Sequence, residues 1–311
     1  MIDVSVIIVT RNTCAFTCAA VRSVLTGGDC LKTEIFVVDN GSTDETPAVL
    51  PREFPAVHYQ RFEQNLGFGR ANNAGARTAE GEFILLLNSD ARLQPGALQL
   101  AVDYLRAHPE CGLAGAQLLN PDGTRQNSIA NFPTLATELL NKSLLRRLFP
   151  RRFPGKEQDY AGPVAVETVV GAFMLIRRAA WQAVGGFDEG YFFFFEETDL
   201  CREIHRRHWT VMHLPQVRVW HEQGQSARIM PAAARIEYWR SRYCYFRKHY
   251  GPLVRYLLTT GLLFRLAVDW LAGALTAALS RSPRARARWQ VQTALWRWHF
   301  AGRPESMGLP R

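Results

Sequence analysis

The chain has 311 residues, of which 47% are hydrophobic and 21% are charged. These proportions exclude a disordered chain, and the length fits one large α/β domain with an appendage or two modest domains. The net charge of +9 belongs to the last quarter, because the residues from Arg240 onward contain thirteen basic and two acidic side chains, and everything before them sums to −2.

The cysteines and the N-terminus indicate the compartment. The six cysteines form neither a C-x-x-C pair nor a zinc-like cluster with histidine, so we expect reduced thiols in the cytosol. The sequence begins almost directly with a strand pattern and lacks the basic region, apolar core and cleavage site of a secretory signal.

Strand and helix patterns alternate along the chain. Apolar and β-branched runs predict strands at 4–10, 34–38, 57–62, 83–87, 111–119, 168–177, 211–214 and 217–220. Helices are predicted at 16–25, from 45, at 65–78, at 96–107 and at 196–207. Because strand and helix repeat in turn, we predict an α/β fold with a mostly parallel sheet and helices on both of its faces.

The predicted strand at 83–87 has the most informative end. Its five apolar residues suit a strand buried on both faces, and Asn88, Ser89 and Asp90 follow its carboxyl end, where ligands of α/β sheets bind. A carboxylate there can hold a divalent cation, which in turn can hold a diphosphate. The alternative is that Asp90 caps the helix that starts near Pro95, although it lies too far before that proline to be the obvious cap.

A second acidic segment follows a run of aromatic residues at 191–195. Glu196, Glu197 and Asp199 begin a predicted helix, where the helix dipole alone favours acidic side chains. Carboxylates next to five aromatic side chains are also partly desolvated, which raises a carboxyl pKa and suits a general base. His221 follows the last predicted strand in a glycine-containing loop that a ligand can reach, although a lone histidine is more often structural.

The basic tail contains a long apolar segment at 253–279, which Arg255, Arg265 and Asp269 interrupt. A charge at mid-span costs about 2.5–3.5 kcal/mol, so we predict that the segment lies in a membrane interface and does not cross the bilayer. Arginines suited to anionic lipid and tryptophans typical of interfaces follow it, namely Arg281, Arg284, Arg286, Arg288, Trp289, Trp296 and Trp298. The alternative is a helical subdomain that packs on the first domain or dimerises.

Two further expectations concern partners. Leucines interleaved with arginines at 132–162 predict an amphipathic helix at a lipid or partner surface, with a solvated helix over the core as the alternative. Nucleic acid is not an expected partner, because the arginines of the tail accompany a long apolar stretch.

Several motifs agree in order and spacing with one family. They are VSVIIVTRN (4–12), VVDNGSTDET (37–46), NLGFGRANNAG (65–75), LLLNSDARL (85–93), GAFMLIRR (171–178), GGFDEGYFFFFEETDLCREI (185–204) and VWHEQGQS (219–226). On these motifs the chain resembles the inverting glycosyltransferases of family 2, and most closely the bacterial rhamnosyltransferase-like branch that builds cell-surface polysaccharides. We therefore expect a catalytic domain at 1–250 and a C-terminal helical, basic, membrane-associating segment at 251–311.

The resemblance implies a GT-A type nucleotide-sugar-binding fold, a divalent cation (Mn2+ or Mg2+), and transfer of a sugar with inversion at its anomeric carbon. The resemblance implies Thr10, Asn12 and Asp39 near the nucleobase and ribose, and Asn65 and Arg70 near the ribose or diphosphate. Asn88, Asp90 and Gly171 belong to the same nucleotide-sugar site, and Asp90 and His221 hold the metal. The catalytic residues are Glu197, as the base, and Asp199, which would cap or brace the helix start. Two departures matter. Asn88 replaces the first acid of the family's triplet, which weakens the metal site, and Glu197 is one methylene longer than the usual aspartate.

The function that the resemblance implies is transfer of L-rhamnose from dTDP-rhamnose to a lipid-linked or polysaccharide acceptor. The enzyme would work in the cytoplasm on the inner face of the cell membrane, and homo-oligomers are possible partners. One alternative is a sugar-nucleotide nucleotidyltransferase, whose first strand precedes a glycine-rich turn that residues 10–13 lack. Another is a catalytically impaired membrane-bound scaffold of the same fold, which Asn88 leaves open.

Overall fold

The computed structural model of the chain describes residues 1–27, 30–150, 152–153, 159–222, 230–280 and 282–311. The predictions made for Arg281, for part of the leucine-arginine segment (151 and 154–158) and for most of the loop after His221 (223–229) fall outside the described residues.

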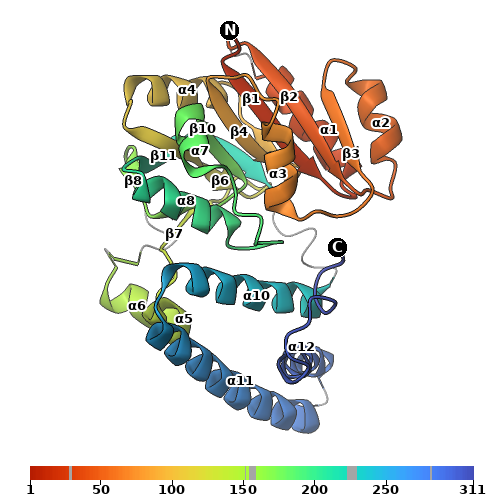
Figure 1. Cartoon of the computed structure of the whole chain (residues 1–311), viewed down its shortest axis with the longest axis vertical. Coiled ribbons are helices and arrows are strands. Elements are labelled where there is room, and N and C mark those ends of the chain that lie inside the picture. Colours follow the sequence, from red (N-terminus) through yellow and green to blue (C-terminus); the bar gives the residue numbers. More distant parts are fainter. Residues whose placement is uncertain (28–29, 151, 154–158, 223–229, 281) are drawn as a thin grey trace.

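One large sheet forms the first domain (Figure 1). Its described strands lie in the order β3-β2-β1-β4-β10-β6-β11-β5, with β8 paired to β11. Their bounds are β1 (Val4–Thr10), β2 (Thr33–Asn40), β3 (His58–Phe62), β4 (Phe83–Asn88), β5 (Ala91–Leu93), β6 (Cys111–Leu119), β8 (Val164–Ala165), β10 (Phe173–Arg177) and β11 (Thr210–His221). Strands β3, β2, β1 and β4 are parallel neighbours, and so are β6 and β11. Strand β10 runs antiparallel to β4 and β6, and β5 and β8 run antiparallel to β11. The prediction of a mostly parallel sheet is confirmed.

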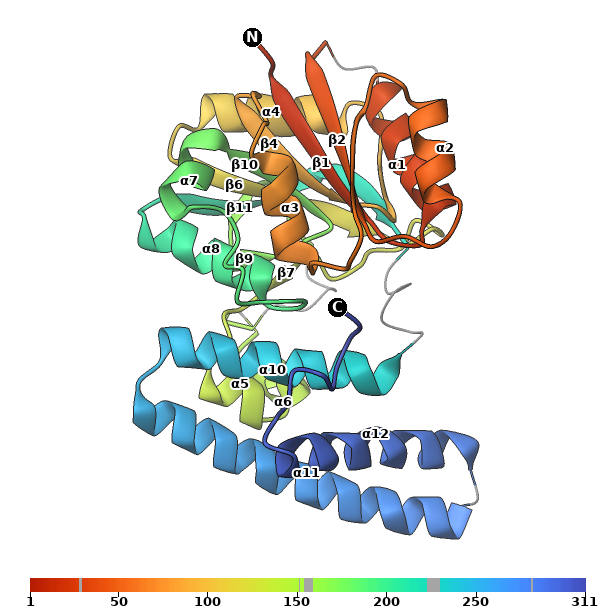
Figure 2. The ribbon, with the colours of Figure 1, turned by 45° about the vertical axis from the view of Figure 1, so that its right-hand side comes forward.

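Helices cover both faces of this sheet (Figures 1 and 2). One apolar core contains α1 (Cys14–Leu25), α2 (Thr46–Glu53) and α4 (Ala97–Ala107), and the other contains α3 (Phe68–Ala76), α7 (Arg178–Val184) and α8 (Glu196–Arg206). Ile7 and Ile8 of β1 belong to opposite cores, and both are fully buried. Burial on both faces explains why β1 and β4 are mostly apolar in the sequence.

Some strand predictions are wrong in detail. The predicted strand at 168–177 is two strands, because β9 (Thr168–Val169) pairs with β7 (Ile129–Ala130) in a small separate sheet. The predicted strands at 211–214 and 217–220 are one strand, β11, whose pairing with β6 is irregular near Pro215, a residue without an N–H to donate. His221 is therefore the last residue of β11, and the short strand β5 was not predicted.

A helical subdomain lies against the sheet domain (Figures 1 and 2). It contains α5 (Leu135–Leu139), α6 (Lys142–Leu148), α10 (Pro231–His249), α11 (Pro252–Ser280) and α12 (Pro283–Phe300). Its core joins Leu258, Leu262 and Trp298 to Tyr191 and Phe195 of the sheet domain. The predicted division at residue 250 lies inside this subdomain, between α10 and α11. Trp298 is 1% exposed, so its prediction as an interfacial residue is wrong.

Helix α11 has two apolar faces. Among the helices in the described residues, α11 is long and apolar enough to cross a membrane, judged by length and composition alone. In the structure, 17% of its most apolar segment is buried. Leu258, Leu262 and Leu266 face the subdomain core. The exposed apolar side chains fall on one face of the helix and form an outer stripe, called here the α11 stripe: Leu253, Tyr256, Leu257, Phe264, Val268, Leu271, Leu275 and Leu279. At 100° per residue, the charged residues of α11 lie off this stripe.

Candidate active site

The carboxyl ends of neighbouring strands bring most of the predicted site residues together. Thr10 at the end of β1 lies beside Asp39 of β2, and Asn88 ends β4 on the other side of β1. Asp90 stands in the turn between β4 and β5, and β5 pairs with the end of β11, where His221 lies. Residues from four separate parts of the sequence thus share one edge of the sheet, which is the expected place for a ligand.

Asp90 and His221 face each other across this edge. Asp90 Oδ1 lies 3.4 Å from His221 Nε2, and both side chains are largely buried. The second ring nitrogen, Nδ1, lies 3.0 Å from Gln126 Oε1. The Gln126 amide is oriented by its Nε2, which donates to the His221 carbonyl at 2.6 Å and to Asn120 Oδ1 at 2.9 Å. Because Oε1 is then an acceptor, Nδ1 donates to it, and Nε2 is the ring nitrogen that faces Asp90.

A carboxylate oxygen and a ring nitrogen that face each other in this way are the ligand types of a divalent cation. Asn88 supplies a third oxygen, because its Oδ1 is buried and has no hydrogen-bond partner within the described part of the chain. Carboxylate, imidazole and amide oxygen are suitable ligands for Mn2+ or Mg2+, and a fixed acceptor on the far ring nitrogen is typical of a ligating histidine. The residues present therefore fit a divalent cation. Gln126 was not predicted, because no sequence pattern shows that residue 126 lies beside residue 221.

The loops after β1 and β2 are held together by polar contacts. Asn12 has a left-handed backbone (φ 55°), and its Oδ1 accepts from the Thr43 N–H at 2.7 Å. Thr10 and Asp39, predicted near the nucleobase and ribose, are both buried. Asp39 accepts a hydrogen bond from the Tyr59 hydroxyl at 2.5 Å. In this arrangement Thr10 and Asp39 brace the loops, and Asn12 is the exposed member of the three.

Asn65 and Arg70 lie at the next loop along the sheet. Asn65 Oδ1 accepts from Asn40 Nδ2 at 2.8 Å, which fixes the loop before α3. The Asn65 amide also donates to the carbonyl of Pro310 at 2.8 Å, a contact with the end of the chain that no sequence pattern indicates. Arg70 is exposed, and its Nε donates to the Glu189 carbonyl at 3.3 Å. Asn65 is thus partly engaged, whereas much of Arg70 is accessible.

Of the two adjacent glutamates, Glu197 opens into a cavity. This Glu197 cavity has a volume of about 280 Å³, and its lining includes Asn127, Asn131 and Tyr238. Glu196 is buried, and its Oε2 has no hydrogen-bond partner within the described residues. Burial raises the pKa of Glu197. The pKa of Glu196 is raised well above its ordinary value, mainly by burial and to a smaller extent by the negative charge of Glu197. Glu197 is therefore the member of the pair that can meet a ligand.

A short turn connects Glu197 with the edge of the sheet. Gly171 packs against it, since a Cβ added at Gly171 would lie 3.5 Å from Glu197 Cβ. The carbonyl of the next residue, Ala172, accepts from the Asn88 N–H at 3.1 Å. Gly171 and Ala172 thus link the predicted base to Asn88 at the edge of the sheet through these two contacts.

Asp199 points away from this site. Its Oδ2 accepts from Lys248 Nζ at 2.7 Å, and its Oδ1 lies 2.6 Å from His249 Nε2. Asp199, Glu203 and His249 have ligand-type atoms within 4.8 Å of one another. Because Lys248 already neutralises Asp199, the arrangement is better explained as an ion-pair network that fastens α8 to α10. Asp199 therefore braces the domain junction, whereas it was predicted to brace the helix start.

The turn before Glu196 is strained, and α10 holds it in place. Phe194 and Phe195 have left-handed backbones, with φ of 72° and 71°. This conformation costs a non-glycine residue about 1–3 kcal/mol. Tyr238 of α10 packs against both rings, and Ser241 Oγ donates to a carbonyl of the same turn at 2.8 Å. The helical subdomain thus sets the direction in which Glu197 points.

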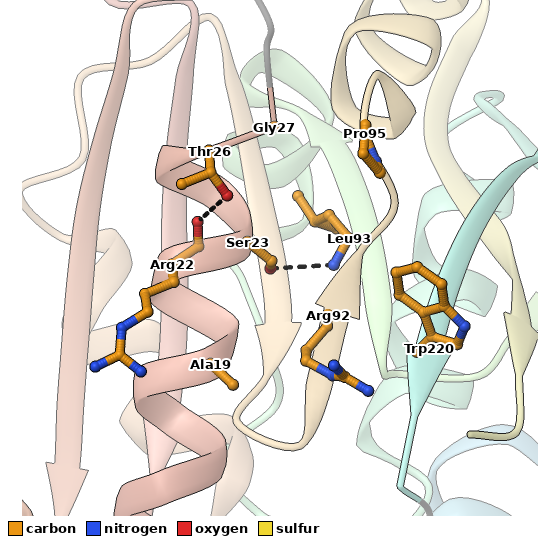
Figure 3. A pocket seen from close by; sticks show the side chains of 9 residues that line it. All are labelled: Ala19, Arg22, Ser23, Thr26, Gly27, Arg92, Leu93, Pro95 and Trp220. Atoms are coloured by element: carbon orange, nitrogen blue, oxygen red, sulfur yellow. Dashed lines mark hydrogen bonds between the residues drawn. The ribbon is translucent and has the colours of Figure 1, made fainter.

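A separate cavity of about 280 Å³ lies between α1, β5 and β11 (Figure 3). Arg92 packs over the Trp220 ring at 5.5 Å, and the Leu93 N–H donates to Ser23 Oγ at 3.1 Å. None of the predicted site residues lines it, so we assign it no part in the site.

Solved structures share this fold. The mannosyltransferase PcManGT from Pyrobaculum calidifontis, in complex with GDP-Man and Mn2+, matches with a TM-score of 0.53 and 19% identity, over 94% of this chain and 84% of its own. GalNAc-T7, solved with UDP, GalNAc and Mn2+, matches with a TM-score of 0.54 and 17% identity, over 71% of this chain and 44% of its own. These likenesses confirm the expected GT-A type fold.

Sequence relatives narrow the class. An N-acetylglucosaminyl-diphospho-decaprenol L-rhamnosyltransferase of Mycobacterium tuberculosis is 28% identical over 233 residues, which are 70% of this chain and 76% of the relative. The rhamnosyltransferase WbbL of Escherichia coli is 29% identical over 147 residues, which are 44% of this chain and 54% of WbbL. These relatives and the shared fold identify the chain as an enzyme of the glycosyltransferase class.

The family assignment rests on the longest match. Residues 5–185 fit the sequence model of glycosyl transferase family 2, which is more than half of the chain, and the chain belongs to that family. The resemblance to its rhamnosyltransferase-like branch is confirmed, and the nucleotidyltransferase alternative is excluded.

Proposed function

We propose that the protein transfers L-rhamnose from dTDP-rhamnose, with inversion, to a lipid-linked acceptor in the synthesis of a bacterial cell-surface glycan. The names of the two sequence relatives support the sugar, and the name of the Mycobacterium tuberculosis relative supports a lipid-diphosphate acceptor. The observation that carries the proposal is the connection of Glu197, in its cavity, to the edge where Asp90 faces His221.

The acceptor hydroxyl enters the Glu197 cavity in this mechanism. Its oxygen attacks the anomeric carbon of the donor sugar while Glu197 accepts its proton, and the bond between that carbon and the diphosphate oxygen breaks on the opposite side. Attack in line with the departing group inverts the anomeric centre. Burial raises the pKa of Glu197, so its carboxylate is a stronger base than an exposed glutamate.

The proposed metal ligands assist the departure of the diphosphate. A divalent cation bound by Asp90, His221 and Asn88 would supply positive charge next to the departing diphosphate. The imidazole of His221 favours Mn2+ over Mg2+. Gln126 keeps His221 Nε2 directed at Asp90, and the neutral amide of Asn88 supplies an oxygen ligand without a charge.

We also propose that the enzyme lies on the inner face of the cell membrane through the α11 stripe. Phe264 and Leu271 are 74% and 62% exposed at the centre of this stripe. Replacing both with glutamate should move the protein from the membrane to the soluble fraction at low salt, without opening the subdomain core. A double variant that stays on membranes would contradict this placement.

A donor panel tests the proposed reaction. The full-length protein with Mn2+ and lipid-linked N-acetylglucosamine should release dTDP from dTDP-rhamnose faster than it releases nucleotide from other nucleotide sugars. Use of another donor would overturn the choice of sugar. If dTDP binds more tightly with Mn2+ but no donor is consumed or slowly hydrolysed, the catalytically impaired scaffold is the better explanation.

A further inference from the structure

The helical subdomain contains an open cavity whose lining is both basic and apolar. It lies between α5, α10, α11 and α12, and its volume is about 860 Å³. Figure 2 shows α10 and α5 on one side of this region and α11 and α12 on the other. Its lining combines leucines with arginines: Leu139, Leu262, Leu266, Arg235, Arg265 and Arg288. We call it the arginine cavity.

The cations of the arginine cavity outnumber its carboxylates. Glu138 pairs with the buried Arg242 at 2.9 Å, and Asp269 lies 3.9 Å from Arg265. Arg235 packs over the Tyr238 ring at 5.7 Å. In the described part of the chain, neither Arg235 nor Arg288 has an acidic partner. An anion that entered the cavity would therefore find two unpaired guanidinium groups.

The arginine cavity adjoins the Glu197 cavity. Thr137, Glu138, Lys142 and Tyr238 line both of them. Helix α11 separates the arginine cavity from the α11 stripe: Leu262 and Leu266 face inward, and the stripe faces outward. Basic and apolar surface is thus placed between the proposed base and the proposed membrane-facing side.

We propose that the arginine cavity binds the diphosphate and the first isoprenoid carbons of the lipid-linked acceptor, whose sugar then extends into the Glu197 cavity. This inference rests on the proposed function for the nature of the acceptor. Arginine forks bind diphosphate oxygens with paired hydrogen bonds, and the leucines accommodate the start of the lipid chain. A nucleotide or an acidic peptide would use the arginines but would leave the leucines without an apolar partner.

Farnesyl diphosphate is a short probe of this chemistry. We expect calorimetry on the full-length protein, with a chelator present so that metal-dependent donor binding is suppressed, to show that it binds. The double variant Arg235→Gln/Arg288→Gln should bind it about tenfold more weakly or worse, because each substitution removes a paired phosphate contact. The control Arg247→Gln/Arg284→Gln removes the same charge from the same two helices outside the cavity, and should change the affinity less than about twofold.

Other ligands separate the possible occupants. Inorganic diphosphate and farnesol should each bind far more weakly than farnesyl diphosphate, since each offers one half of the recognised chemistry. Equal loss of affinity in the two double variants, or equal affinity for inorganic and farnesyl diphosphate, would overturn the proposal. Displacement of the probe by vesicles of phosphatidylcholine and phosphatidylglycerol, with the same dependence on Arg235 and Arg288, would assign the cavity to bilayer lipid.

The proposed function and the proposed cavity fail in different experiments. If the donor panel rejects dTDP-rhamnose while the farnesyl diphosphate results hold, the sugar is wrong and the cavity is supported. If dTDP-rhamnose is consumed but farnesyl diphosphate does not bind, the cavity is wrong. Binding of dTDP with Mn2+ should be the same in wild type and both double variants, which also verifies that the variants are folded.

Discussion

Asp90–His221 and Asp199–His249 are carboxylate–histidine pairs that the fold uses in opposite ways. At the edge of the sheet, Asp90 faces His221 at 3.4 Å, and Gln126 holds the far side of the imidazole. At the junction of the two domains, Asp199 lies 2.6 Å from His249, and Lys248 also donates to Asp199. The second pair has an ammonium group of the chain beside it, whereas no lysine or arginine pairs with Asp90 in the described residues.

The difference shows how the same residue types become a ligand site or a structural tether. The Asp199 network is completed by groups of the chain itself, so a metal there would have to displace Lys248. The Asp90 pair has no such group of the chain beside it in the described residues, and the buried Asn88 Oδ1, two residues before Asp90, also lacks a partner there, so this edge of the sheet gains most from a cation that the chain does not supply. We call Asp90–His221 the open pair and Asp199–His249 the closed pair. Substitutions in the open pair should change ligand binding, and substitutions in the closed pair should change stability.

The largest expected effect is that of Asp90→Ala, which should abolish the Mn2+-dependent binding of dTDP without lowering the stability much. Asp199→Asn is its counterpart at the closed pair. It should leave dTDP affinity near normal and lower the free energy of unfolding by about 2–4 kcal/mol, because it removes the acid from a buried ion pair. Calorimetry and urea unfolding of both variants check the contrast. If wild type binds dTDP equally well with and without chelator, the assignment of a metal to the Asp90 pair is wrong.

The adjacent glutamates extend the same contrast to the base. Glu197→Gln keeps the shape of the side chain and removes its basicity, so kcat should fall about a hundredfold or more while donor affinity stays near normal. Glu196→Gln should be far milder, because Glu196 does not line the cavity. Steady-state rates of nucleotide release distinguish them. If the two variants exchange these effects, Glu196 is the base; if neither slows transfer, another group takes the proton.

Much of this arrangement was predictable because it depends on local patterns. The buried strand before Asn88 and Asp90 is a run of apolar residues, and its polar end lies at the sheet edge in any parallel fold. Contacts between distant segments were not predictable in this way. Gln126 reaches His221, and Lys248 reaches Asp199, through the packing of whole elements, and no spacing within the sequence indicates either contact.

Gln126→Ala tests the orientation of the open pair. Without the amide, the His221 ring can rotate or change its tautomer, so its Nε2 is no longer fixed toward Asp90. Loss of such a supporting contact typically lowers metal affinity about 10–100-fold, and the apparent affinity for Mn2+ measured by its effect on nucleotide release should fall within that range. His221→Ala should be at least as severe. A Gln126→Ala variant with wild-type Mn2+ dependence would show that the pair needs no support.

The smallest expected effect concerns pH and the sealed Glu196. Its pKa in the folded protein is raised well above the ordinary value by burial and by Glu197, whereas in the unfolded chain it is ordinary. Between these two values the folded state holds more protons than the unfolded state, so stability falls as the pH rises through the folded pKa. Glutamine does not titrate, so Glu196→Gln should be more stable than wild type at neutral pH and should depend less on pH. Urea unfolding midpoints from about pH 5 to 8 measure both differences. If stability depends on pH as steeply in the variant as in wild type, another group takes up the proton. Burial also raises the pKa of Glu197, so Glu197 is the group to replace next.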